Sequence, residues 1–200
     1  MKVTIFDYGA GNIHSLSKAI ATSGASVVVE ADPVRAIDTD MLVLPGVGAF
    51  GLAADRLAPG RAAMAAALRD GLPCLGICLG MQLLFEQSDE ASPNVRGLGI
   101  FGGQVTKLRA QRVPQIGWNS IEAGRDAALD KTAVPYAYYA NSYVCRPTDD
   151  SIVTAWSTHE DDRFPAIVRS GKTVGVQFHP EKSSSPGVRF LHAILSEATT

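Results

Sequence analysis

The sequence feature that most restricts the fold is an apolar run that leads into a Gly-x-Cys-x-Gly motif and then into a helix-forming stretch. It covers residues 73–85, PCLGICLGMQLLF. The order of strand, sharp turn and helix is that of a nucleophile elbow, with cysteine in the position of serine. Such a turn brings backbone segments close together beside the nucleophile, and Gly76 and Gly80 leave room for them. The motif therefore predicts that Cys78 lies between a buried strand and the N-terminus of a helix.

This position suits a catalytic thiol. The unpaired N–H groups and the positive dipole end of the helix favour the thiolate over the thiol. The same N–H groups, that of Leu79 first, can stabilise the oxyanion of a tetrahedral intermediate. Cys74 and Cys145 lack flanking glycines, and we interpret them as small buried hydrophobic residues. Cys74 and Cys78 also lack a second ligand pair at the spacing of a zinc site, so we expect no bound metal.

A short polar segment after an apolar strand supplies the candidate base. Residues 174–178, VGVQF, run directly into His179, Pro180 and Glu181. Proline disfavours the helical region for the residue before it, so His179 is expected to be extended. Side chains two apart in an extended segment point to the same side, so Glu181 can hold the imidazole and stabilise its protonated form. This pairing favours catalysis over a solvated surface histidine. The other histidines have no such partner in their local sequence: His14, His159 and His192.

Two glycine-rich loops follow predicted strands. The first, Gly9-Ala10-Gly11, resembles the start of a dinucleotide motif, but His14 stands in the place of the third glycine. We therefore expect no dinucleotide cofactor, and no other cofactor. The second loop, residues 45–48 (PGVG), lacks the Lys-Ser or Lys-Thr of a Walker motif. We interpret it as backbone, Gly48 included, that approaches a reacting carbonyl and offers an N–H to the oxyanion.

Strands and helices are expected to alternate along the first half of the chain. The expected strands are 3–6, 27–30, 41–44 and 72–77, and the expected helices are 13–22 and 60–70. This alternation favours a parallel sheet with helices on both faces. In the second half we expect antiparallel additions to the same sheet and a closing helix over 186–197. These additions are the strand-like runs 99–108, 135–145, 152–156, 165–168 and 174–178.

Composition limits the domain count and the classes of partner. The 200 residues, 46% of them hydrophobic, suffice for one core, so we expect a single domain over 1–200. A net charge of -2 creates no field that would attract nucleic acid or an anionic membrane. Every apolar run is shorter than the ~20 residues of a membrane helix, and we expect no secretory signal because the first residues lack its long apolar core. Three cysteines without a regular framework agree with a soluble protein of the cytoplasm.

Three motifs in this order resemble those of a known family. They are residues 44–50 (LPGVGAF), 76–82 (GICLGMQ) and 179–183 (HPEKS). Together they resemble the class I glutamine amidotransferases, and within these the glutaminase subunits of imidazole glycerol phosphate synthases. The likeness extends from DYGAGN at 7–12 through IGWN at 116–119 to the C-terminal helix, which is nearly the whole chain. It implies an α/β fold with a flavodoxin-like, doubly wound mixed sheet.

The resemblance implies an activity and a set of site residues. Cys78 would attack the side-chain amide of glutamine to form a γ-glutamyl thioester, which water then hydrolyses. Gln82, Ser142 and Tyr143 would line the glutamine site, and the loop at 45–48 would supply a second oxyanion donor through Val47. Relatives often carry His-Ser-Tyr where this chain has Asn141-Ser142-Tyr143, so position 141 departs from the pattern.

The resemblance also implies a partner. It would be a cyclase subunit with a (βα)8 barrel that forms a heterodimer with this chain, receives the ammonia through a channel and makes imidazole glycerol phosphate for histidine biosynthesis. The need for a partner also follows from chemistry, because ammonia released into neutral water becomes unreactive ammonium. Asn12, Trp118 and Lys182 are the candidate docking residues, although Lys182 is equally compatible with a solvated surface lysine.

Other classes remain open at this level. The chain is also compatible with a free-standing cysteine hydrolase of the same fold, such as a peptidase or a γ-glutamyl hydrolase. An ammonia-producing subunit of another synthase, such as that of pyridoxal phosphate, has a similar length. A non-catalytic binding module of this fold is a third alternative, and the intact set of Cys78, His179 and Glu181 argues against it.

Overall fold

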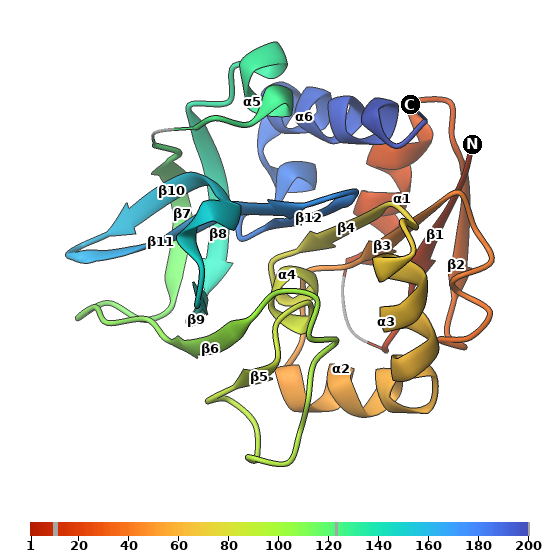
Figure 1. The fold of residues 1–200 in the computed structure, drawn as a ribbon. Coiled ribbons are helices and arrows are strands. Elements are labelled where there is room, and N and C mark those ends of the chain that lie inside the picture. Colours follow the sequence, from red (N-terminus) through yellow and green to blue (C-terminus); the bar gives the residue numbers. More distant parts are fainter. Residues whose placement is uncertain (10–11, 123, 200) are drawn as a thin grey trace.

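A seven-stranded mixed sheet lies at the centre of the computed structural model, which describes residues 1–9, 12–122 and 124–199 (Figure 1). The strand order is β10-β11-β12-β4-β3-β1-β2. Five neighbouring strands run parallel, and β11 and β10 follow antiparallel at one edge. Their bounds are β1 (Lys2–Phe6), β2 (Ser26–Glu30), β3 (Met41–Leu44), β4 (Cys74–Ile77), β10 (Val153–His159), β11 (Asp162–Ser170) and β12 (Thr173–Val176). The inner strands β3, β4 and β12 are buried along their whole length, as expected of strands covered on both faces.

Helices cover the two faces of this sheet (Figure 1). One hydrophobic core contains the inward side chains of α1 (Ile13–Ala21), α5 (Ala127–Thr132) and α6 (Ser184–Glu197). The other core contains those of α2 (Phe50–Leu57), α3 (Arg61–Arg69) and α4 (Leu79–Leu83). Short 3-10 turns occupy Ala58–Gly60, Asp150–Ile152 and Pro180–Lys182; the last is called η3 below. Because β1, β3, β4 and β12 run parallel, the residues that follow them meet at one edge of the sheet.

Two smaller sheets correct the prediction for the second half of the chain. Residues 99–108 and 135–145 do not join the central sheet. The first run contains β6 (Gly103–Lys107), which pairs with β5 (Gln87–Ser88) and β9 (Tyr143–Pro147). The second run is broken by a bend at Ser142 into β8 (Tyr136–Asn141) and β9, and β8 pairs with β7 (Gln115–Ser120). Because of this bend the chain passes from the β7–β8 sheet into the β5–β6–β9 sheet, and the continuous apolar pattern of the sequence does not indicate where the bend lies.

The pairing of β12 is a further correction. It was predicted among the antiparallel additions, yet it lies parallel to β4, with Val176 opposite Ile77, and antiparallel only to β11. Antiparallel addition to the central sheet is therefore confirmed for β10 and β11, whereas β6 and β8 are antiparallel within the two smaller sheets. The partner of β12 is about a hundred residues away in the chain, so local periodicity contains no information about it.

Helices α2 and α5 and strand β7 are among the elements that were absent from the prediction. Helix α2 has no side-chain cap at Ala49; instead the distant Glu90 carboxylate accepts from the Phe50 N–H at 2.9 Å. Helix α5 is only six residues long, with Asp126 as its cap. Strand β7 contains Gly117 with φ 129°, and glycine is an uncommon residue inside a strand. Each element thus depends on long-range contacts or is too short for a periodic signal.

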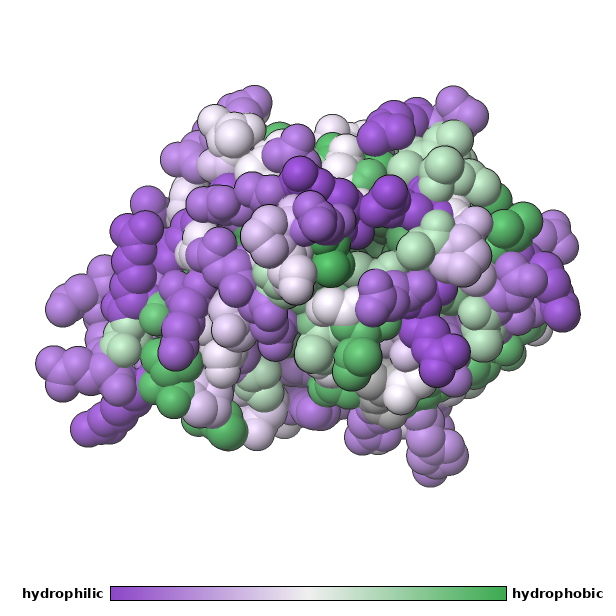
Figure 2. Space-filling view, turned by 90° about the horizontal axis from the view of Figure 1, so that it is seen from below, coloured by the Kyte–Doolittle hydropathy of each residue, from purple (hydrophilic) through white to green (hydrophobic). Residues whose placement is uncertain are grey.

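The surface mixes polar and apolar residues. On the face drawn in Figure 2, hydrophobic residues gather in small patches separated by hydrophilic ones. Small apolar patches are ordinary on protein surfaces. Recognition on this face therefore depends on local shape and chemistry.

Candidate active site

The nucleophile elbow is present at the end of β4. Cys78 follows Ile77 with φ 48° and ψ -102°, and α4 begins at Leu79. A positive φ is unfavourable for a residue with a side chain and persists only where the surroundings enforce it. Here the Cys78 N–H donates to the Val176 carbonyl at 2.7 Å, which ties the turn to β12. The predicted position of Cys78 between strand and helix is found in the structure.

The two flanking glycines are required by close backbone contacts. A Cβ on Gly80 would lie 2.0 Å from the Leu44 carbonyl oxygen, and one on Gly76 would lie 2.7 Å from the Gly80 carbonyl group. Both obstacles are main-chain atoms, which cannot turn aside as a flexible side chain would. The elbow and β3 therefore pack backbone against backbone, and the sharp turn depends on both glycines.

His179 reaches the same edge of the sheet from β12. Its backbone N–H donates to the Tyr138 carbonyl at 2.8 Å, and its side chain is fully buried. Its Nδ1 lies 2.8 Å from Oε1 of Glu181, whose side chain is 6% exposed. The residue is extended as predicted, but Pro180–Lys182 forms the turn η3, so the pair arises from this turn rather than from a continuous extended segment. The second carboxylate oxygen of Glu181 has no partner within the described residues.

Burial, Cys78 and Glu181 all influence the pKa of His179. Burial, the largest influence, lowers the pKa of His179, but the influence of Cys78 and then of Glu181 outweighs it and raises that pKa from 6.5 to about 9. The Nε2 atom has no hydrogen bond of ordinary geometry among the described residues. The ring is therefore held by Glu181 on one side, and its other nitrogen remains available to exchange a proton beside the sulfur.

A cavity of about 210 Å³ opens over Cys78. All residues predicted for the oxyanion and glutamine sites line it: Val47, Gly48, Leu79, Gln82, Ser142 and Tyr143. The Gln82 side-chain amide donates to the Tyr143 carbonyl at 3.0 Å, which joins α4 to β9 across the cavity. Asn141, the position that departs from relatives, also lines the cavity; its amide donates to the Tyr143 carbonyl at 3.1 Å.

The glycine loop at 45–48 is held at both ends. The Tyr8 hydroxyl donates to the Pro45 carbonyl, and the Phe50 N–H donates to Glu90 after the loop. The middle of the loop lies against the triad, because a Cβ on Gly46 would lie 2.8 Å from Cε1 of His179. Its backbone is therefore fixed beside the sulfur, where an oxyanion would form.

Two residues at the site were not predicted from the sequence. Glu90 lines the cavity. Gln177 lies beneath the site, and its amide nitrogen is 3.5 Å from the Cys78 sulfur. Glu90 stands in a run of polar residues that also fits a solvated loop, so its sequence gave no signal. Gln177 is a polar residue inside an apolar strand, and that contrast was an available signal.

The candidate docking residues lie on the surface. Trp118 is 55% exposed and contacts Tyr138 edge to face, with ring centroids 6.4 Å apart. The Lys182 ammonium lies 6.0 Å from the same tyrosine ring. Asn12 is exposed and caps α1, which contacts η3. Of the Gly9-Ala10-Gly11 turn, the second and third residues lie outside the described part of the chain.

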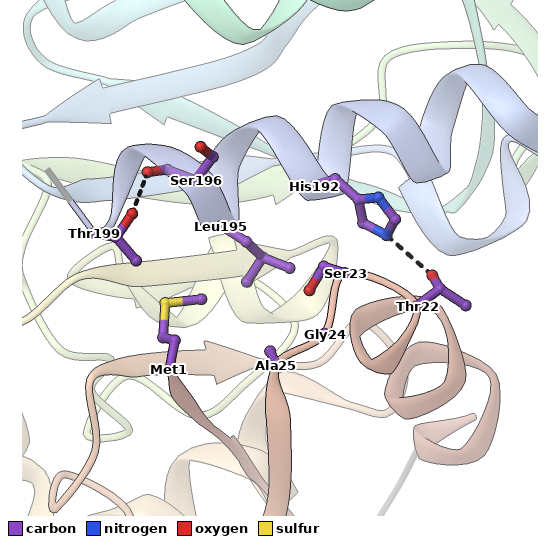
Figure 3. Close-up of a pocket in the computed structure, with 9 residues that line it drawn as sticks. All are labelled: Met1, Thr22, Ser23, Gly24, Ala25, His192, Leu195, Ser196 and Thr199. Carbon is purple, nitrogen blue, oxygen red and sulfur yellow. Dashed lines mark hydrogen bonds between the residues drawn. The ribbon is translucent and has the colours of Figure 1, made fainter.

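A second hollow, of about 450 Å³, lies far from this chemistry. It is formed by the first residue of the chain, the turn after α1 and the end of α6 (Figure 3). His192 contributes its ring, and Nε2 lies 3.0 Å from the Thr22 hydroxyl and 3.1 Å from the Ala19 carbonyl. The ring nitrogen is thus engaged with α1 and tethers α6 to it. The cavity over Cys78 is therefore the better candidate for catalysis.

Comparison with known proteins agrees with this geometry. Residues 4–196 match the family model described as "Glutamine amidotransferase class-I". The chain belongs to the class I glutamine amidotransferase family. Relatives named "Imidazole glycerol phosphate synthase subunit HisH" include that of Natronomonas pharaonis, which is 41% identical and covers 95% of this chain and 92% of its own. Those of Pyrococcus furiosus (41%; 95% and 96%) and Thermus thermophilus (42%; 96% and 95%) are similar.

Solved structures agree on the fold. One titled "Crystal structure of glutamine amidotransferase" superposes with a TM-score of 0.77 at 18% identity and 99% coverage of both chains. PurLQS from Thermotoga maritima gives 0.71 at 19% identity, with 98% coverage of both. The predicted α/β fold class is confirmed, and so is the predicted membership in the glutamine amidotransferase enzymes, within the family of HisH subunits. The roles of the individual site residues remain predictions.

Proposed function

We propose that this chain hydrolyses L-glutamine at Cys78 and serves as the glutaminase subunit of an imidazole glycerol phosphate synthase in histidine biosynthesis. The Cys78 thiolate attacks the side-chain amide carbon, while the proton of the thiol resides on His179. His179 gives this proton to the leaving nitrogen, so ammonia departs and a γ-glutamyl thioester remains. Water attacks the thioester, His179 takes its proton, and glutamate and the thiol are released. The observation that carries the proposal is the cluster of thiol, imidazole and carboxylate beside one cavity.

The cavity has groups suited to each end of an amino-acid substrate. Its volume of about 210 Å³ is below that of drug-sized sites and suits one small molecule. The Glu90 carboxylate provides a partner for the α-ammonium group of glutamine. Gln82, Ser142 and Tyr143 offer amide, hydroxyl and backbone groups along the wall. We assign these four residues to glutamine binding.

Oxyanion stabilisation is assigned to backbone groups from two elements. Leu79 is the first residue of α4 and follows the nucleophile, and its N–H has no acceptor inside the helix. Val47 and Gly48 line the same cavity and belong to the loop held by Tyr8 and Glu90. Donors already in place at the developing charge need no reorganisation during the reaction, which makes them effective in catalysis.

We propose that ammonia passes directly to a cyclase subunit with a (βα)8 barrel. The two chains form a heterodimer, and the barrel converts its nucleotide to imidazole glycerol phosphate and an aminoimidazole carboxamide ribotide. The relatives are named as subunits of this synthase, which supports a partner. We assign docking to the outer face of the β7–β8 ribbon with Asn12 and Lys182, because exposed apolar side chains follow this ribbon: Ile116, Trp118 and Tyr136.

Replacing Trp118 by alanine should weaken binding of the cyclase by at least tenfold. A large aromatic side chain at the centre of an interface typically contributes about 2 kcal/mol or more. The measurement is calorimetric titration of the separately purified cyclase into this chain. Val29→Ala is the control, because Val29 is a 49% exposed apolar residue outside the β7–β8 ribbon. It lies on β2, an edge strand of the central sheet. Equal affinity of the Trp118 variant and the parent would refute this docking surface.

A glutamine-mimicking electrophile tests the proposed activity. We expect it to label Cys78 alone of the three cysteines, because Cys74 and Cys145 are completely buried and burial raises the pKa of both thiols. Peptide mapping by mass spectrometry identifies the labelled site. Added glutamine should slow the labelling by competing for the cavity. Label on Cys74 or Cys145 would overturn the assignment of the nucleophile.

We also propose that the chain forms one domain and acts in the cytoplasm. Its three thiols form no disulfide in the described structure, and unpaired thiols fit a reducing compartment. Within the described residues, every helix is too short or too polar to cross a membrane.

A further inference from the structure

Gln177 has a buried side-chain amide whose hydrogen-bonding groups are only partly satisfied by the described residues. It follows β12 directly, is completely buried, and its backbone N–H donates to the Ala166 carbonyl at 2.9 Å. Its side-chain nitrogen lies 3.5 Å from the Cys78 sulfur, whereas its oxygen Oε1 has no partner among the described residues. Burial of a half-satisfied amide is unfavourable. A hydrophobic side chain of the same size would be less costly, which points to a function for the amide.

Strand register fixes this contact. Val176 lies opposite Ile77 in the parallel pair of β12 and β4. The next residue along the chain is Gln177 after β12 and Cys78 after β4, so these two residues lie side by side. The Cys78 N–H also donates to the Val176 carbonyl. The pairing of β12 with β4 therefore holds the amide against the sulfur.

An N–H donor at this position stabilises a negatively charged sulfur. The Ala140 carbonyl oxygen, 4.0 Å from the same sulfur, has the opposite effect because an acceptor disfavours the thiolate. The sulfur also faces titratable groups on other elements. These are His179 with Glu181 from η3, Tyr8 after β1 and Cys145 on β9.

We infer that Gln177 is a catalytic residue that donates a hydrogen bond to the Cys78 sulfur and thereby favours the thiolate. This inference rests on the proposed function, in which that sulfur is the nucleophile. The buried amide thus stabilises the thiolate through an N–H donor, as the N–H groups of a helix N-terminus do, but from the segment that follows β12.

The test replaces Gln177 by methionine, which has a similar shape and no N–H donor. In the complex with the cyclase, kcat for glutamine hydrolysis should fall by about tenfold to a hundredfold, while KM changes less than threefold. Alkylation of Cys78 by iodoacetamide, which needs the thiolate but no oxyanion site, should slow at neutral pH, and its pH profile should move to higher pH. The melting temperature should stay equal or rise, because an unsatisfied polar group has been removed. A purely structural amide predicts the reverse pattern, with lower stability and an unchanged alkylation profile.

Gln115→Met is the matched control. Gln115 is also a buried glutamine whose Oε1 has no partner among the described residues, but it lies in β7. We expect its alkylation profile and kcat to equal those of the parent. A Gln177 variant with the parent profile would overturn the inference, and so would faster alkylation, which would mean that the amide oxygen faces a thiol. Glutamine turnover that survives in Cys78→Ala would instead refute the proposed function.

Discussion

Glutamine hydrolysis should fall by roughly 10⁴- to 10⁶-fold when Cys78 is replaced by alanine, the range found when a covalent nucleophile is removed. The sulfur forms the thioester, and none of the other groups that line the cavity is a cysteine or lysine that can replace it. Turnover is measured as glutamate released per active complex. The loss should appear in kcat, because the groups assigned to glutamine binding remain in place.

Cys74→Ala is the matched control. Cys74 is four residues earlier, on β4, is completely buried, and belongs to the core that contains α2 and α3. It should retain the parent rate within a few-fold, with a modest loss of stability from the small cavity. The Cys78 variant should still bind the cyclase, because the removed atom lies inside the site. Glutaminase activity near the parent rate in Cys78→Ala would refute the nucleophile.

The same variant should lower the pKa of His179. Burial acts to lower that pKa, and Cys78 is the first of the groups that together raise it to about 9. Without the sulfur only Glu181 opposes burial, so the imidazole should lose its proton at a lower pH than in the parent. Nuclear magnetic resonance titration of the ring protons measures this value. An unchanged pKa would show that the sulfur and the imidazole are not coupled.

The sequence was most informative where function restricts local conformation. Gly76 and Gly80 mark the elbow because backbone atoms occupy the space of their absent side chains. His179 and Glu181 are only two residues apart in the chain, so their pairing was visible without a fold. Such features are properties of a few consecutive residues.

Residues that act through long-range contacts were harder to predict. Glu90 enters the cavity only because β5 and the following loop fold back beside α2. Gln177 contacts Cys78 only because β12 pairs with β4, which local patterns do not specify. The small β7–β8 sheet depends on the bend at Ser142 for the same reason. The fold class follows from alternation of elements, whereas the pairing of distant strands requires the three-dimensional structure.

Replacing Gly80 by alanine should destabilise the protein by about 3 kcal/mol, the upper end of the usual cost of overpacking, and remove most glutaminase activity. The new Cβ would lie 2.0 Å from the Leu44 carbonyl oxygen and 2.6 Å from its carbon. Because both are backbone atoms of β3, either the strand or α4 must move. A shift of about 1 Å at the elbow is enough to reduce turnover by roughly a hundredfold.

Gly51→Ala separates this clash from the general effect of adding a methyl group. Gly51 lies in α2, and its Cβ would meet only the Ala91 side chain, at 3.7 Å, an ordinary contact. Alanine is favoured over glycine in a helix, so this variant should be more stable than the parent by about 0.5–1 kcal/mol. Urea unfolding of both variants gives the comparison. If Gly80→Ala matches the parent in midpoint and in turnover, α4 does not pack on the backbone of β3, and the strained turn at Cys78 has some other support.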